Sequence, residues 1–146
     1  MDDTRHVTAA ELGLEPVLRV APDLHLVEAA RLLVGAGVDT LLVDTAPPTE
    51  VTEHDFVRAL AEGVAPATPV HDLVREAALF VDHNVRVDRI VELMLGARRH
   101  GVVIVDESGH VLGMLTLPVA VAALLGGPPW LGALRVALRI DGTTIP

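Results

Sequence analysis

The sequence of 146 residues contains no cysteine, no tyrosine and no lysine, and all eleven of its basic residues are arginines. The absence of cysteine excludes a thiol nucleophile, a thiolate metal site and a disulfide framework, and it is compatible with a reducing compartment. Twenty acidic residues set the formal net charge at −9. We expect no nucleic acid polymer as a partner, because such partners require a basic stripe that this chain lacks. The charge leaves room for a small nucleotide, which needs only a local anion site.

Charged residues are absent between Val111 and Leu134, and the mean hydropathy is +0.47. Glycines and prolines interrupt this run, so it is predicted to form a strand, a helix and turns in a buried core, with no membrane span. The first residues, MDDTRHVTAAELG, lack the basic start and apolar centre of a signal peptide. We therefore expect a cytoplasmic protein.

Both halves of the chain show the same order of predicted elements: strand, helix, strand, strand, helix. The first half contains a β-prone run after Pro16, a helix with Leu26, Ala29, Ala30, Leu33 and Val34 on one face, the strands TLLVD and EVT, and the helix EHDFVRALAEG. The second half contains the strand ALFVDHN, a helix with Val87, Ile90, Val91, Met94 and Leu95 on one face, a hairpin in GVVIVDESGHVLGMLT, and the helix LPVAVAALLGG. Val87 follows Leu26 by 61 residues and Thr116 follows Thr52 by 64, so the halves are an internal repeat.

This duplication predicts an α/β fold of the α+β kind, with two β-α-β-β-α repeats related by a pseudo-twofold axis. The predicted segments are an N-terminal segment (1–15), a first repeat (16–64), a second repeat (65–127) and a C-terminal tail (128–146). One repeat alone buries too little apolar area, so two copies are expected to pack face to face and to leave two equivalent clefts.

A strand-to-helix corner borders each predicted cleft, VTEHD in the first repeat and LTLPV in the second. Thr52 and Thr116 occupy the same place in the two corners. Asp55, however, has Val119 as its counterpart, so only the first corner keeps an acid.

The repeats resemble a cystathionine-beta-synthase (CBS) domain pair, also called a Bateman module. The resemblance is carried by VAPDLHLVEAARLLVGAGV and VTEHDFVRALAEG in the first repeat and by VDESGHVLGMLTL in the second, and it covers about 17–127. The second repeat is most similar to the second CBS unit of hemolysin-like magnesium and cobalt transport proteins. Their membrane-spanning segment has no counterpart here, so transport is not expected.

The resemblance implies an adenosine ligand such as AMP, ADP, ATP or S-adenosylmethionine. Asp55 would accept hydrogen bonds from ribose hydroxyls, Thr52 would meet ribose or phosphate, and the start of the helix would favour an anion. Other implied contacts are Leu18, Val20 and Leu42 around the adenine, and Arg98, Arg99, Arg75 and His54 at the phosphate. Thr49 replaces the glycine of the family pattern.

The second corner departs from that pattern. It keeps Gly113 and Thr116, but Val119 cannot accept a ribose hydroxyl, and a polar group buried without a partner costs about 1–3 kcal/mol. We expect this second site to be weak or empty.

Simpler interpretations stay open for these residues. Thr52 and Asp55 also fit a helix cap, Thr116 fits a cap alone, and Arg98–His100 fits the solvated end of a helix. The seven histidines lack metal-site spacing, so no metal is expected. The tail around Trp130 is expected to pack on the repeats or to dock on a second subunit or client protein.

The sequence thus predicts a regulatory, non-enzymatic adenosine-binding module in which ligand-dependent closure or dimer rearrangement signals to an unknown client protein. The resemblance also implies a homodimer. The alternative is a ligand-free interaction scaffold, which Thr49, Val119 and the shortened TAPPT hairpin favour. A small enzyme is disfavoured, because the chain lacks cysteine, a phosphate-binding loop and a Gly-x-Ser-x-Gly elbow.

Overall fold

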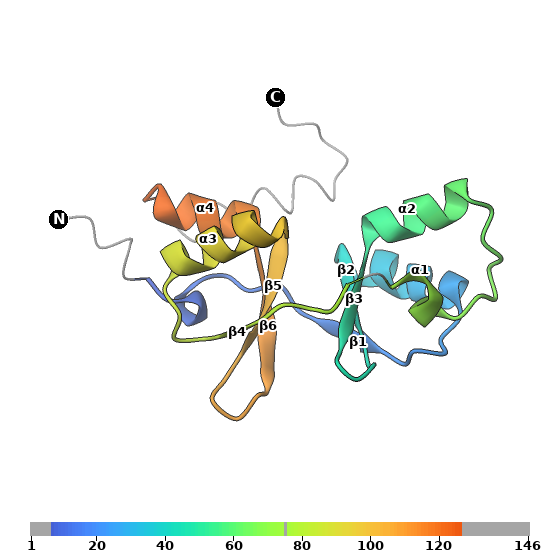
Figure 1. The fold of residues 1–146 in the computed structure, drawn as a ribbon, viewed down its shortest axis with the longest axis horizontal. Coiled ribbons are helices and arrows are strands. Elements are labelled where there is room, and N and C mark those ends of the chain that lie inside the picture. The colour runs from blue at the N-terminus through green and yellow to red at the C-terminus, as the bar shows by residue number, and fades with distance from the viewer. Residues whose placement is uncertain (1–6, 75, 127–146) are drawn as a thin grey trace. The chain divides into compact units, whose positions relative to one another are not determined.

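The computed structural model describes residues 7–74 and 76–126 (Figure 1). The chain folds into two compact units. Among the described residues, one unit is Val17–Ala78 without residue 75, and the other combines residues 7–16 of the N-terminal segment with residues 79–126. The N-terminal segment therefore packs with the second repeat and not with the first, which directly follows it in the chain.

The described part of each unit has one three-stranded sheet and two α-helices, in the order that the sequence predicts. In the unit Val17–Ala78 the elements are β1 (Leu18–Val20), α1 (Leu26–Ala36), β2 (Thr40–Val43), β3 (Thr49–Thr52), α2 (Glu53–Ala61) and the 3-10 helix η3 (Val70–Leu73). In the second unit they are the 3-10 helix η2 (Ala9–Glu11), β4 (Phe80–Asp82), α3 (Val87–Ala97), β5 (Gly101–Val105), β6 (Val111–Thr116) and α4 (Leu117–Leu124).

The two sheets have the same topology. β1 runs parallel to β2, which pairs antiparallel with β3. Likewise, β4 runs parallel to β5, which pairs antiparallel with β6. A parallel pair requires a crossover connection, and α1 and α3 provide it. The predicted duplicated α/β fold is confirmed at the level of each repeat.

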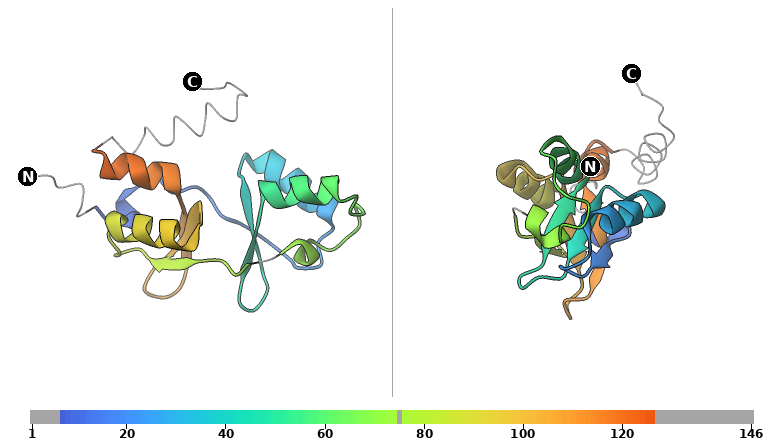
Figure 2. Two further views of the ribbon diagram at one scale, coloured as in Figure 1. Left: turned by 45° about the horizontal axis from the view of Figure 1, so that its top comes forward. Right: turned by 90° about the vertical axis from the view of Figure 1, so that its right-hand side faces the viewer.

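Both helices of a unit cover the same face of its sheet (Figures 1 and 2). In the first repeat, Leu41 and Val43 of β2 face a core that includes Ala29 and Leu33 of α1. In the second unit, Val102 and Ile104 of β5 face the buried side chains of α3 and α4. Successive strand residues point to opposite faces, so Leu42 and Val103 lie on the faces away from the helices, yet both are buried.

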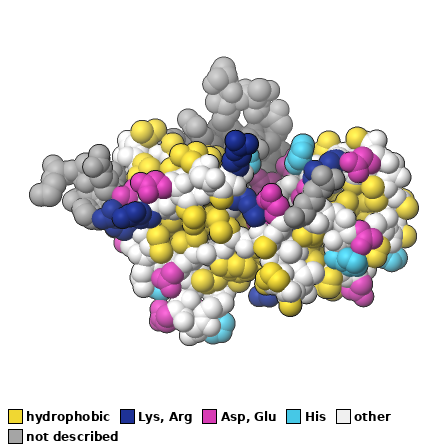
Figure 3. Space-filling view, viewed as in Figure 1, with side chains coloured by type: hydrophobic (Ala, Val, Ile, Leu, Met, Phe, Trp, Pro, Cys, Tyr) yellow, Lys and Arg dark blue, Asp and Glu magenta, His cyan; other side chains and the backbone are white. Residues whose placement is uncertain are grey.

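Two residues assigned to the buried face of a helix are exposed instead. Val34 on α1 is 78% exposed and Leu95 on α3 is 62% exposed. Each follows a buried residue, Leu33 or Met94, and one residue further along a helix turns the side chain by about 100° away from the core. Figure 3 shows hydrophobic side chains among the charged ones on one face of the molecule.

The N-terminal segment extends the sheet of the second unit. The backbone of Glu15 exchanges two hydrogen bonds of 2.9 Å with Met114 of β6, and Ala9 and Leu12 are part of the core. A Cβ added to the neighbouring Gly113 would lie 2.7 Å from the Cβ of Leu14 and 2.9 Å from the carbonyl oxygen of Glu15. Glycine at 113 is therefore required by the close approach of the N-terminal segment, whatever its relation to a ligand.

The first repeat protects its sheet edge in the same way. Ala77, which precedes β4, pairs with Thr49 of β3, and the backbone N–H of Ala78 donates to the carbonyl of Pro48 at 3.0 Å. In each unit the outer edge of the last strand is thus covered by the segment that leads into the other repeat's first strand. Covered edges are protected against unwanted strand pairing. Among the described helices, none has the length and hydropathy needed to cross a membrane.

Candidate ligand-binding site

The two predicted corners have the same backbone geometry. Thr52 pairs with Thr40 across the first sheet, and the N–H of Glu53 donates to the carbonyl of Asp39 at 2.8 Å. Thr116 pairs with Gly101 across the second sheet, and the N–H of Leu117 donates to the carbonyl of His100, also at 2.8 Å. In both corners the strand runs directly into the helix, with the threonine as the N-cap residue.

In the first corner, Thr52 and Asp55 form a capping box at the start of α2. Oδ2 of Asp55 accepts hydrogen bonds from the backbone N–H of Thr52 at 2.8 Å and from its hydroxyl at 3.1 Å. The carboxylate also lies at the positive end of the helix dipole, where a negative charge is stabilised. The structure thus brings the two predicted ligand residues into direct contact, in an arrangement that also satisfies the helix end.

Arg58, one turn along α2, forms an ion pair with Asp55 through Nη2 and Oδ1. The side chains are 28% and 15% exposed, respectively. Arg58 was not among the predicted site residues, although the i, i+3 spacing of an acid and an arginine on a predicted helix indicates such a pair.

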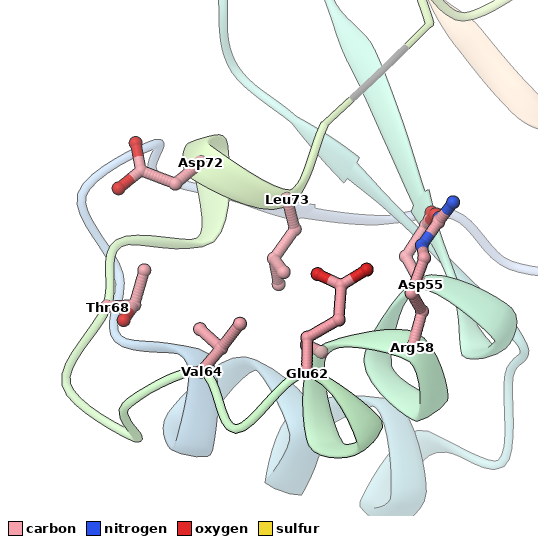
Figure 4. Close-up of a pocket in the computed structure, with 8 residues that line it drawn as sticks. Asp55, Arg58, Glu62, Val64, Thr68, Asp72 and Leu73 are labelled. Atoms are coloured by element: carbon pink, nitrogen blue, oxygen red, sulfur yellow. The ribbon is translucent and has the colours of Figure 1, made fainter.

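Asp55 and Arg58 stand at one end of a pocket between α2 and the segment that follows it (Figure 4). The pocket volume is about 180 Å³. Its other lining residues are Ala59, Glu62, Val64, Thr68, Asp72 and Leu73. Pockets that hold drug-sized ligands measure roughly 300–1,000 Å³, so this one is too small to enclose a whole nucleotide.

The second corner has no capping partner for its threonine. Thr116 is 9% exposed, and its hydroxyl is buried without a hydrogen-bond partner. Val119, at the place of Asp55, is part of the hydrophobic core. The missing acid therefore leaves Thr116 with a polar atom that the helix end does not satisfy.

The corners also differ in charge. In the first, Asp39 precedes β2, and Glu53 and Asp55 lie in the first turn of α2. In the second, the segment before β5 is Arg98-Arg99-His100, and the first turn of α4 contains no acid.

Arg98 has a φ of 56°, a left-handed conformation that Gly37 adopts at the equivalent end of α1. An arginine here accepts a conformation that costs L-residues about 1 kcal/mol.

The apolar residues expected around the adenine do not share a surface. Leu18 and Val20 lie on the helix-covered face of the sheet and pack in the core. Leu42 lies on the opposite face, which it shares with Thr52, because alternate strand residues face opposite sides. Three consecutive apolar residues, Leu41 to Val43, give no alternation in the sequence, so only the register of β1 and β2 separates Leu42 from the other two.

The expected phosphate contacts are distributed between the repeats. His54 is exposed in the first turn of α2, close in sequence to Asp55. Arg98 and Arg99 lie beside the second corner, in the other compact unit. Arg75 and the tail with Trp130 lie outside the described residues. Within the described ranges, no group of three or more histidines and acids is arranged to hold a metal ion.

Comparisons with known proteins agree with this architecture. The family model of the CBS domain matches residues 70–124. No curated protein matches the chain significantly. Among solved structures, a CBS domain protein from Pyrobaculum aerophilum complexed with AMP has 20% sequence identity and a TM-score of 0.69, over 94% of this chain and 100% of that one.

Two further structures have the same fold. The CBS domain of a bacterial CNNM/CorC family Mg²⁺ transporter in complex with ATP has 16% identity and a TM-score of 0.70, over 86% of this chain and 92% of that one. A CBS domain pair in complex with 5′-methylthioadenosine and S-adenosyl-L-methionine has 20% identity and a TM-score of 0.68, over 82% of this chain and 96% of that one.

Two α/β repeats with matching strand-to-helix corners define a duplicated module of the type found in these structures. The second repeat is similar to the CBS domain family, whose model matches it, and the chain has the fold of a tandem CBS domain pair.

Proposed function

We propose that this CBS pair is a regulatory module that binds an adenosine-containing ligand at the corner of the first repeat. The observation that carries the proposal is the Asp55 carboxylate, which stands at the start of α2 in contact with Thr52. A carboxylate can accept both hydroxyls of a ribose, and the N-terminus of a helix favours an anion. Leu42 lies on the same sheet face as Thr52, but its side chain is buried and offers no open apolar surface to a base.

The similar structures support this ligand class. Their ligands are AMP, ATP, and 5′-methylthioadenosine with S-adenosyl-L-methionine, and all of these contain adenosine. ADP belongs to the same class. The second corner, without an acid, is the weaker site in this proposal, and Thr116, Arg98 and Arg99 can offer only a hydroxyl and positive charge there.

In the proposed mechanism the module is not an enzyme. Ligand binding tightens the contact between repeats or between the subunits of a homodimer, and a client protein in the cytoplasm senses the change. A ligand shifts such an equilibrium only by the difference between its affinities for the two states. Regulation therefore requires that the ligand bind the closed or rearranged state more tightly.

A ligand-free interaction scaffold is the second candidate. The capping box favours it, because Thr52 and Asp55 are satisfied without a ligand. In that case the corner would serve only to start α2, and the function of the fold would be to present surfaces that bind other proteins.

Isothermal titration of nucleotide-free protein with AMP, ATP and S-adenosylmethionine separates these functions. We expect binding by the wild type and a loss of at least about tenfold in Asp55→Asn, because the amide keeps an acceptor for Thr52 N–H but loses the charge and one acceptor oxygen. Asp88→Asn is the matched control, since Asp88 is also an acid in the first turn of a helix but lies on α3 in the other repeat. Heat from none of the three compounds would support the scaffold.

A further inference from the structure

The outer side of α4 lacks the polar residues that a surface helix normally carries. Its inner side packs in the core of the second unit, and the helix contains no charged residue. On the side away from the core, Pro118, Ala122 and Leu125 are spaced by four and three residues and form one stripe, the outer stripe of α4. Pro118 is exposed, Ala122 is half-buried and Leu125 is 82% exposed. Helices that are apolar on all sides normally lie in a protein interior, so this stripe requires a cover.

The duplication of the chain provides a comparison for this stripe. The helices α2 and α4 both begin directly after an N-cap threonine. Counted from these threonines, the positions of α2 that correspond to the outer stripe are His54, Arg58 and Ala61. Polar side chains thus occupy two of the three positions in α2 and none in α4. The first repeat can expose this side of its helix to water, whereas the second repeat exposes only apolar side chains there.

The chain continues beyond α4 with a segment that has an apolar side of its own. The structure describes the chain as far as Gly126, and residues 127–146 follow. The spacing in 130–139 predicts a helix with its largest apolar residues on one side and its arginines on the other. The apolar residues are Trp130, Leu131, Leu134 and Leu138, and the arginines are Arg135 and Arg139. Ten helical residues span about 15 Å, which is enough to follow the whole length of α4.

The end of α4 places this segment next to the outer stripe. Gly126 has a φ of 78°, a left-handed conformation that commonly ends a helix. Gly127, Pro128 and Pro129 follow, and such residues form turns. Connections of about two to eight residues join neighbouring antiparallel helices. A short tether of this kind keeps the segment at a roughly millimolar effective concentration near Leu125.

We propose that residues 130–139 dock on the outer stripe of α4 in the same chain, so that one contact covers both apolar surfaces. A second copy of the chain is a poorer occupant, because each partner of a stable interface buries about 800 Å² and the stripe has only three side chains. The docked segment withholds the stripe from other proteins, and a partner that binds α4 has to displace it. This proposal does not depend on ligand binding at the first corner.

Labelling of single cysteines with a maleimide tests the proposal in the full chain, which contains no cysteine of its own. Leu125→Cys reports on the outer stripe. Leu60→Cys is the matched control, because Leu60 in the last turn of α2 is also 82% exposed. Relative to its rate in denaturant, Leu125→Cys should react at least about tenfold more slowly than Leu60→Cys, since burial of one large apolar side chain favours docking by that factor. Adding Leu134→Glu should remove this protection.

The fluorescence of Trp130 gives an independent measurement, because it is the only tryptophan in the chain. Acrylamide should quench Trp130 several-fold less in the folded protein than in denaturant. Leu125→Glu should raise the quenching towards the denatured value, whereas Leu60→Glu should leave it unchanged. If Leu125→Glu fails to fold, the labelling of Leu125→Cys decides.

Three results would overturn the proposal. The first is equal labelling of the two cysteine variants, which would show that the outer stripe is open. The second is protection of Leu125→Cys that is lost on dilution of the protein, which would identify a second copy of the chain as the cover. The third is protection that Leu134→Glu leaves unchanged, which would assign the cover to a segment other than 130–139.

Discussion

Replacing the threonine of each corner by valine tests whether the two corners differ as the structure shows. Valine has nearly the shape of threonine but no hydroxyl, so each substitution removes one polar atom and leaves the packing almost unchanged. In the first corner, the hydroxyl of Thr52 donates to Asp55 at 3.1 Å as part of a capping box. In the second, the hydroxyl of Thr116 is buried and has no partner.

The magnitudes follow from these environments. Loss of an N-cap threonine costs about 1 kcal/mol, so Thr52→Val should lower the free energy of unfolding by roughly that amount. Burial of a hydroxyl without a partner costs about 1–3 kcal/mol in proteins, so Thr116→Val should raise the free energy of unfolding by about 1 kcal/mol. The two variants should thus lie on opposite sides of the wild type, about 2 kcal/mol apart.

Urea denaturation of the nucleotide-free proteins, followed by circular dichroism, measures both changes under the same conditions. The midpoint should fall in Thr52→Val and rise in Thr116→Val, with similar slopes in all three proteins. A loss of stability in Thr116→Val as large as in Thr52→Val would show that the hydroxyl of Thr116 has a partner in solution. That result would contradict the conclusion that only the threonine of the first corner has a hydrogen-bond partner.

Two other predictions concern the second unit. Gly113→Ala should lower the thermal midpoint and cost about 1–3 kcal/mol of stability, because the added Cβ would lie 2.7 Å from the Cβ of Leu14. A variant that unfolds at the same temperature as the wild type would exclude that close approach. Hydrogen bonds from the backbone N–H groups of His110 and Ser108 hold the pKa of Asp106 below its ordinary value. Because the folded state lowers this pKa, the stabilisation is present above the unfolded pKa and is lost as the pH falls through the folded one. NMR titration should therefore give Asp106 a pKa below its ordinary value, and the Asp106→Asn variant should lose less stability on acidification than the wild type.

The element order was predictable from the sequence because it depends on local signals. Gly37 and Gly63 adopt left-handed conformations at or just past the ends of α1 and α2, where helices commonly place glycine. Helical spacing identified the buried positions on α1 and α3, but it also assigned two exposed residues to the buried face. The exceptions, Val34 and Leu95, are equivalent residues, and each lies just outside the edge of the buried stripe.

The pairing of segments distant in the chain could not be predicted in this way. Glu15 and Met114 are almost a hundred residues apart, and the short sequence segment around either residue does not specify the other as its strand partner. Gly113 shows the consequence, since the sequence suggested a ligand-related glycine and the structure explains it by the approach of Leu14. Non-local contacts of this kind depend on the whole fold.

For the candidate site, the spacing of Thr52 and Asp55 was enough to predict that they meet. It was not enough to decide their purpose, because a capping box and a ribose site use the same threonine and acid at the start of a helix. The placement of Leu18 and Val20 in the core could have been inferred from strand alternation. The pairing of Arg58 with Asp55 could also have been predicted from their i, i+3 spacing. Only the structure shows that Arg58 contacts Oδ1 of Asp55.

A crystal structure of the protein grown with AMP is the direct test of adenosine binding at the first corner. We expect the ribose hydroxyls of AMP on the carboxylate of Asp55. AMP bound only beside Thr116, or no nucleotide bound at a concentration that saturates related CBS pairs, would show that the first corner is a helix cap and not a ligand site.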